Sequence, residues 1–210
     1  MNTKQRILNT AEKLFAHNGI EATSLRAITA SAKVNLAAVN YHFQSKEALV
    51  HSVIARRMDP INQRRLVMLD ACEAAAGNDP LPLAQVLEAF LLPVMEANAS
   101  HGSDFGPILG RIYTEPKEFA EKIFKDHLQT VSRRFLAAFH RALPELTKSE
   151  LIWRIHFMVG VMAHAVGAGH LLVKISEGAC DPSDVHGMVR RMESFLLAGF
   201  QAPVAVVAKC

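Results

Sequence analysis

Residues Leu25–Phe43 hold two short helical patterns that are joined by only a few residues. Ser24 is a good N-cap for the first helix, and Asn35 is a good N-cap for the second. Apolar residues recur at helical spacing on one side of each helix: Leu25, Ile28 and Ala32 in the first, and Leu36, Val39 and Phe43 in the second. Two helices of about two turns each that cross at a short turn form a helix-turn-helix. The stretch therefore predicts either a DNA-reading unit or a plain helical hairpin in an all-α domain.

The outward side of the second helix favours the DNA-reading alternative. Its residues, together with the cap, are Asn35, Ala37, Ala38, Asn40, Tyr41 and His42. Small side chains allow a close approach to DNA, and polar tips can form hydrogen bonds with base edges in the major groove. We expect Asn40 to read a base, because its amide can bond adenine through two hydrogen bonds. Tyr41 and His42 are expected to touch phosphate.

Residues beside the two helices are candidates for holding the DNA backbone. Thr23 and Ser24 stand at a helix start, where hydroxyls and free backbone N–H groups can bind a phosphate. Simple capping is the alternative for both. Arg26, near the start of that helix and off its apolar face, is a candidate for contacting the DNA backbone or the groove edge, and a solvated side chain is its alternative. Ser45 can cap a further helix, and Lys46 follows it at the end where the helix dipole disfavours a cation. A cation in that place favours a phosphate partner.

A longer pattern extends over residues 4–50, about a quarter of the chain. It consists of Ile7-Leu8, Ala11, Leu14-Phe15, Gly19, Thr23-Ser24-Leu25, Ile28, Ala32-x-Val34, Tyr41-His42-Phe43 and SKEAL at 45–49. These residues resemble the N-terminal domain of the TetR/AcrR family of bacterial transcriptional regulators. The turn position that the family usually gives to Gly is Lys33 here, which strains a left-handed conformation by roughly 1 kcal/mol. The family's frequent paired aromatic residues are Asn40-Tyr41 here, so base contacts need not transfer.

Two segments resemble one branch of that family more closely. NLAAVNYHF at 35–43 and WRIHFMVG at 153–160 are similar to the PsrA-like branch. The resemblance implies a long-chain fatty acid or an acyl thioester as the effector.

Charge is distributed unevenly along the 210 residues. Residues 1–58 contain eight Lys and Arg against three Glu and carry a net charge of +5, although the whole chain carries +3. A basic segment fits a polyanion, since phosphate neutralisation dominates nucleic-acid affinity. A solvated basic face is the alternative. Half of the residues are hydrophobic and a fifth are charged, which is typical of a globular protein.

Cysteine usage and hydropathy indicate the compartment. Cys72, Cys180 and Cys210 lie far apart and form no CxxC pair, which favours a reducing cytoplasm over a disulfide framework or a zinc site. No positively charged leader precedes an apolar core at the N-terminus. Residues Ile155–Val173 lack Asp, Glu, Lys and Arg over nineteen positions, which reaches transmembrane length, but they include three histidines and three glycines. We therefore expect a helix buried all round in a soluble bundle, no membrane partner and a cytoplasmic location.

The rest of the chain reads as helix, and alternating helix and strand signals are absent, so the predicted fold is all-α. Beyond the helix-turn-helix, the predicted helices cover 3–18, 46–76 with a kink or break at Pro60, 83–99 with a kink at Pro93, 104–113, 117–142, 148–175 after a Thr147 capping box, and 182–200 after Asp181 or Ser183. We predict a helix-turn-helix domain at 1–48, a connecting helix at 49–77, an effector-binding and dimerisation domain at 78–200, and a tail at 201–210.

The last two predicted helices carry small and flexible residues at helical spacing. These are Gly160, Ala163 and Gly167 in one helix, and Met188, Met192 and Phe195 in the other. Two helices from each of two protomers could pack as a four-helix bundle, and packing within one chain is the alternative. A two-fold dimer would read both halves of a pseudo-palindromic operator. The family resemblance implies such a homodimer too.

The resemblance also implies a small-molecule pocket in the helices from 83 to 142. The expected lining residues are Phe90, Leu91, Met95, Phe105, Ile108, Leu109, Arg111, Ile112, Phe124 and Leu128. Arg111 could meet an acidic group of the ligand, and an ion pair with Glu115 is its alternative. Each apolar residue of this set could equally be plain core.

Motifs of catalysis are missing from the sequence. There is no HExxH, no Gly-rich phosphate loop and no Ser-x-Gly elbow, and His156 and His164 have no acidic neighbour at metal-ligand spacing. We therefore predict no catalytic residue, no metal, no cofactor and no enzyme. The predicted function is a homodimeric repressor of double-stranded operator DNA that is released by an apolar or acidic small molecule. The alternative is a similar DNA-binding protein that acts through a protein partner without a small effector.

Overall fold

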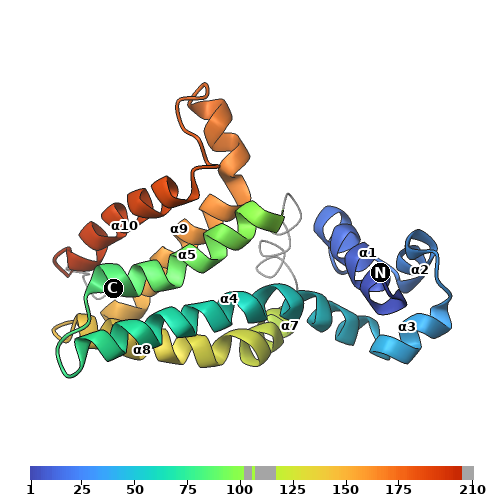
Figure 1. The fold of residues 1–210 in the computed structure, drawn as a ribbon, viewed down its shortest axis with the longest axis horizontal. Helices are drawn as coiled ribbons and strands as arrows, with labels where there is room; N and C mark the ends of the chain where they lie inside the picture. Colours follow the sequence, from blue (N-terminus) through green and yellow to red (C-terminus); the bar gives the residue numbers. More distant parts are fainter. Residues whose placement is uncertain (102–105, 107–116, 205–210) are drawn as a thin grey trace, which may run out of the picture. The chain divides into compact units, whose positions relative to one another are not determined.

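The computed structural model describes residues 1–101, 106 and 117–204. These residues form helices and connecting turns, with no strand among them, so the predicted all-α fold is confirmed (Figure 1). The helix predicted at 104–113 lies outside the described residues apart from Gly106. The chain divides into two compact units: Met1–Asn62 with Ser100–Gln129, and Gln63–Ala99 with Thr130–Cys210. The predicted division into a domain at 1–48, a connecting helix at 49–77 and a domain at 78–200 stays a prediction.

The first unit begins with α1 (Thr3–Asn18), α2 (Leu25–Ala32) and α3 (Leu36–Phe43), which contact one another. Their apolar faces meet in a core that includes Ile7, Ala11, Phe15, Ile28, Val39 and Phe43, all at most 4% exposed. The prediction for Leu36 was wrong, because this side chain is 44% exposed. Leu36 is the first residue of α3, and the preceding turn leaves it outside the packed face.

The long helix α4 (Lys46–Ala76) completes this core with Leu49, Val50, Val53 and Ile54. It runs without interruption through Pro60, so the predicted break is not present. Proline removes one backbone hydrogen bond, and here Pro60 is exposed, so water can reach the carbonyl left without a partner. α5 (Leu83–His101) likewise continues through Pro93.

A buried ion cluster holds α1 against α4 within the first unit. Glu12 is 3% exposed and pairs with both Arg56 and Arg57. The Nε of Arg57 donates to the Glu12 carboxylate at 2.6 Å. Arg56 also donates to the Asn9 side chain at 2.6 Å. The two guanidiniums compensate a carboxylate that would otherwise be costly to bury.

The helix predicted at 117–142 consists of three segments. α7 (Lys117–Ile123) is followed by η2 (Phe124–Leu128), a π-helical turn, and then by α8 (Gln129–Ala142). In the π turn the Gln129 N–H donates to the Phe124 carbonyl, five residues earlier. Single π turns inside α-helices are rare and occur often at functional sites.

The second unit is built from the second half of α4, most of α5, α8, α9 (Lys148–Ile175) and α10 (Val185–Gln201). Aromatic rings fill its core: Phe90 meets Phe135 with ring centroids 5.0 Å apart, and Phe139 stacks on Phe200 at 5.1 Å. Thr147 caps α9 as predicted. α10 is capped by Asp184, not by Asp181 or Ser183, because the Asp184 side chain accepts the Gly187 N–H at 2.8 Å.

α9 is the helix predicted to be buried all round, and that prediction was wrong. Within Ile155–Val173, Phe157 is 61% exposed, Leu171 is 43% exposed and Val173 is 41% exposed. Among the described residues, one helix is long and apolar enough to cross a membrane, at Lys148–Gly169, and about a quarter of its most apolar window is buried. One such helix is weak evidence for a membrane span, and exposed apolar side chains on a bundle helix also fit a packing partner.

Candidate nucleic-acid interface

The helix-turn-helix is fixed by local hydrogen bonds that the sequence predicts. The Ser24 hydroxyl accepts the Ala27 N–H at 3.1 Å, and the Asn35 side chain accepts the Ala38 N–H at 2.8 Å. Ser45 caps α4 in the same way through Ala48, at 3.0 Å. Each cap fixes the residue where its helix begins, so the turn between α2 and α3 has a defined length.

Lys33 in that turn adopts the left-handed conformation, with φ 52° and ψ 49°. A non-glycine residue costs energy there, and α1 contributes to holding the strained turn. The Arg6 guanidinium donates to the carbonyl of Ala32 at 2.7 Å and to that of Lys33 at 3.1 Å. These contacts satisfy carbonyls at the end of α2 that the helix cannot pair itself.

The outer face of α3 is open to solvent. Ala37 and Asn40 are exposed, Tyr41 is 83% exposed, and Ala38 and His42 are partly exposed. On the opposite face Val39 and Phe43 are buried. The structure thus presents the residues predicted to contact DNA from this helix, with Asn40 as the predicted base reader, on one outward face of α3.

The predicted phosphate-binding residues fall into two groups. Ser24 and Arg26 are exposed, whereas Thr23 is 1% exposed and its hydroxyl donates to the Gly19 carbonyl at 2.7 Å. Thr23 therefore acts inside the domain, and the phosphate contact predicted for its side chain has no support in this geometry. Lys46 donates to the Glu21 carbonyl at 2.9 Å, which positions its ammonium beside the connector in front of α2.

Two features of the surface were missed from the sequence. Leu36 is exposed at the N-terminal end of α3, where helix-turn-helix proteins contact base edges, and an apolar side chain there suits a thymine methyl group. A basic hollow on the same unit is lined by Met1, Arg6, Asn9, Thr10, Lys13, Ser31, Ala32 and Lys33. The charge of residues 1–58 pointed to such a surface, but the sequence alone did not say which lysines gather on it.

The residues predicted to line an effector pocket are placed unevenly. Phe90, Leu91 and Met95 are buried on α5 in the second unit. Phe124 and Leu128 lie on η2 in the first unit, with Phe124 46% exposed and Leu128 partly exposed. Phe105, Ile108, Leu109, Arg111 and Ile112 lie outside the described residues.

A buried cation on α4 was not predicted. Arg65 is 3% exposed, its guanidinium lies 4.0 Å from the centroid of the Phe90 ring, and its Nε donates to the Phe90 carbonyl at 2.8 Å. The sequence carried a signal for it, because Arg65 falls on the buried stripe of α4 with Ile61 and Leu69.

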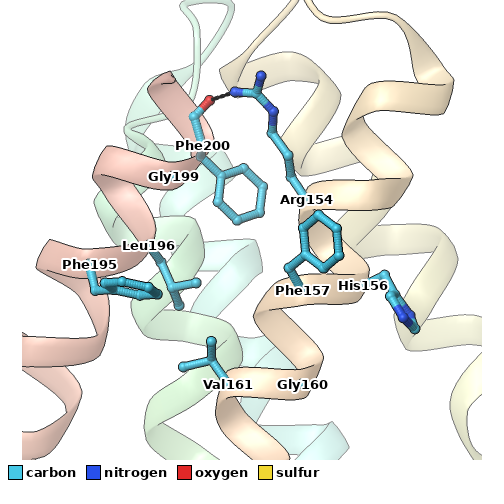
Figure 2. A pocket seen from close by; sticks show the side chains of 9 residues that line it. All are labelled: Arg154, His156, Phe157, Gly160, Val161, Phe195, Leu196, Gly199 and Phe200. Carbon is cyan, nitrogen blue, oxygen red and sulfur yellow. Dashed lines mark hydrogen bonds between the residues drawn. The ribbon is translucent and has the colours of Figure 1, made fainter. Parts of the chain in front are cut away.

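The residues predicted for a dimer interface lie on α9 and α10 in the second unit. Phe195 is 69% exposed, Gly160 and Gly167 are exposed, and Ala163 and Met188 are partly exposed, whereas Met192 is 7% exposed and belongs to the core. A hollow of about 520 Å³ lies on this face. Figure 2 shows Phe157 and Val161 from α9, and Leu196 and Phe195 from α10, among the residues that line it. At its upper end the Arg154 guanidinium donates to the carbonyl of Phe200, and also to that of Ala202 at 2.9 Å.

Comparison with known proteins gives two family matches that together span most of the chain. Residues 7–53 match the family described as "Bacterial regulatory proteins, tetR family", and residues 88–199 match "Tetracyclin repressor-like, C-terminal domain". The second match covers more than half of the chain.

Individual relatives match best over the N-terminal part. The transcriptional regulator UidR of Escherichia coli strain K12 is 40% identical over 52 residues, which are 25% of this chain and 26% of that protein. The chain thus matches about a quarter of the length of that relative. The transcriptional repressor BepR of Brucella suis is 31% identical over 98 residues, which are 47% of this chain and 44% of that protein.

Solved structures of similar fold cover nearly the whole chain. A TetR-family regulator from Bordetella parapertussis superposes with a TM-score of 0.63 at 15% identity, over 98% of this chain and 99% of that one. The fatty acid degradation regulator FadR from Bacillus halodurans superposes with a TM-score of 0.61 at 13% identity, over 97% of this chain and 98% of that one. At such identities the likeness concerns the fold.

Proposed function

The chain belongs to the TetR family of bacterial transcriptional regulators, and from this premise we propose that it is a dimeric cytoplasmic repressor that binds a pseudo-palindromic operator and releases it when a small molecule binds. The families and relatives that match are transcriptional regulators and not enzymes, in agreement with the lack of catalytic motifs. The observation that carries the proposal is the outer face of α3, which presents Asn40, Tyr41 and Ala37 on a helix whose other face is buried.

Selection of genomic fragments by the purified, immobilised protein tests this proposal. We expect recovered fragments to share a pseudo-palindrome with half-sites about one helical turn apart, roughly 34–36 Å centre to centre. Recovery of fragments without a shared sequence, or a lack of salt-sensitive binding to any duplex, would contradict the proposal.

Replacing Asn40 with Ala is expected to lower operator affinity by about 1–3 kcal/mol while binding to random DNA stays nearly unchanged, because the amide reads a base edge. Fluorescence anisotropy on both duplexes at one salt concentration measures the two affinities. Asn18→Ala, which removes an exposed amide at the end of α1, is the matched control and should change neither. Equal losses on operator and random DNA for Asn40→Ala would show that Asn40 does not read a base.

Replacing Lys46 with Ala is expected to weaken binding evenly across sequences and to reduce the slope of log affinity against log salt by about 1, because one phosphate contact is lost. Titrations at several salt concentrations give the slope, and Lys148→Ala at the exposed start of α9 is the control. Because Lys46 also bonds the Glu21 carbonyl, thermal unfolding of the variant must show an intact domain. An unchanged slope in a folded variant would rule out the phosphate contact.

For the effector we propose an apolar or acidic small molecule, such as a fatty acid or an acyl thioester. The PsrA-like resemblance of residues 35–43 and 153–160 supports this class. Phe90, Leu91 and Met95 are buried apolar residues of α5, and the Arg65 guanidinium lies over the Phe90 ring. Mass spectrometry of an organic extract of the purified protein tests it, since a long-chain acid should co-purify in stoichiometric amount. Absence of any bound lipid, together with an operator affinity that fatty acids do not change, would favour the alternative of a protein partner.

A further inference from the structure

Two histidines from distant parts of the chain meet inside the first unit. His51 lies on α4 and His127 lies in η2, with His51 Nδ1 and His127 Nε2 3.3 Å apart and ring centroids 5.5 Å apart. Both side chains are mostly buried, at 17% and 12% exposed. The pair forms a direct side-chain hydrogen bond between these two segments.

The π turn is held in place beside α4 by a second contact. The Asn62 side chain, from a residue 7% exposed, donates to the His127 carbonyl at 2.8 Å. The wider π turn also places Asp126 next to the pair, with its carboxylate 3.6 Å from His51 Nδ1. His127 of η2 thus contacts α4 twice: its backbone carbonyl accepts from Asn62, and its imidazole meets that of His51. An imidazole can change its charge near neutral pH.

The surroundings of the two rings define the neutral arrangement. His51 Nε2 is buried and has no hydrogen-bond partner among the described residues, so a proton is least costly on Nδ1. The Nδ1–H then donates to His127 Nε2, and the Nδ1–H of His127 faces the Asp59 carboxylate at 3.7 Å. In this arrangement both histidines are neutral and each ring has one proton.

Adding a proton disrupts this arrangement wherever it goes. On His127 Nε2, the proton would point at the His51 Nδ1–H, and on His51 Nε2 it would leave a buried donor without an acceptor.

We propose that the His51–His127 pair is a proton-sensitive contact between α4 and η2, closed while both imidazoles are neutral and opened when the pair takes up a proton. α4 continues directly from the helix-turn-helix core through Leu49, Val50 and Val53, so opening the contact changes what α4 is held against. Resting on the proposed function, the consequence is that operator affinity falls as the pH drops through the range in which the pair titrates.

The charges around His51 support this sign. Burial, followed by the Lys122 ammonium, lowers the pKa of His51 below its ordinary value; His127 lowers it further, while Asp126 and Glu47 oppose the shift. A histidine whose pKa is lower in the folded chain binds fewer protons there than in the unfolded chain. Stability is therefore lost as the pH falls below about 6.5, the ordinary value, towards the lowered pKa of the folded state.

Histidine titration by NMR tests the contact without any DNA. In the full chain with ¹³C-labelled histidine, the Cε1 signals of His51 and His127 should titrate together, with at least one midpoint below that of exposed His140. In His127→Gln, which keeps a hydrogen-bonding side chain but cannot be protonated in this range, the His51 midpoint should shift. Independent titration of both histidines with the midpoint of His140, and no change in His51 when His127 is replaced, would overturn the proposal.

Operator binding between pH 7.5 and pH 5.5 tests the consequence. The affinity of the wild-type chain for a fragment recovered by genomic selection should fall about fivefold or more relative to His127→Gln, with His140→Gln as the matched control that behaves as wild type. His42 on the outer face of α3 is present in all three proteins, so the comparison between variants isolates the buried pair. Parallel pH dependence in wild type and His127→Gln would refute the coupling. A failure to recover any operator would refute the proposed function and leave the NMR result to decide the contact.

Discussion

Replacing Phe195 with Asp is expected to convert the proposed dimer into a monomer and to lower operator affinity about a hundredfold or more. Phe195 projects from α10 with 69% of its surface exposed, so the single chain does not need it to fold. In a four-helix bundle of α9 and α10 from two protomers, a carboxylate at this position would be desolvated without a partner. A monomer reads one half-site alone and loses the gain from binding two half-sites at once. Sedimentation and operator titration measure the two effects.

A matched substitution separates dimerisation from a general effect of surface charge. Val67→Asp changes an apolar side chain on α4 that is 56% exposed, and this variant should remain dimeric with unchanged operator affinity. A Phe195→Asp protein that stays dimeric at micromolar concentration would show that this face of α10 lies outside the interface.

Replacing Glu12 with Ala is expected to lower the free energy of unfolding by about 3–5 kcal/mol, because it leaves the Arg56 and Arg57 guanidiniums without their carboxylate in a partly buried site. Chemical denaturation followed by circular dichroism gives this value. Because the cluster holds α1 against α4, operator binding should be lost at the temperature where this domain of the variant unfolds.

The control for Glu12 is a carboxylate in an exposed ion pair. Glu121 pairs with Lys117 at 3.5 Å on α7, with side chains 65% and 83% exposed, and Glu121→Ala should leave the denaturation midpoint nearly unchanged. A similar small effect for Glu12→Ala would mean that solvent replaces the carboxylate at little cost, and that the cluster does not hold α1 in place.

Local features of the fold could be predicted well from the sequence. The bounds predicted for α1 and α9 agree with the structure, and Ser24, Asn35 and Thr147 cap their helices as expected. A capping hydrogen bond joins residues three positions apart, so its signal is contained in a short stretch. The break predicted at Pro60 is not present, because proline removes only one backbone hydrogen bond while buried Met58 and Ile61 on either side of it pack α4 in place.

Contacts between distant residues could not be predicted in this way. Arg6 bonds carbonyls 26 and 27 positions away, and His51 meets His127 across 76 positions. Each of these contacts depends on how the helices pack. The π turn that places His127 against His51 of α4 cannot be predicted from the spacing of hydrophobic residues. The exposed side of α9 was missed for a related reason: an apolar run is compatible with burial in one chain or against a second copy.

The separation of the two faces of α3 has an evolutionary consequence. Val39 and Phe43 hold the helix in the domain, while Ala37, Asn40 and Tyr41 point away from it. Substitutions that accumulate on the outward side can change which promoters are recognised while the folded scaffold keeps its stability. A duplicated gene of this kind could therefore acquire new regulatory targets through a few surface changes, without first needing mutations that restore foldability.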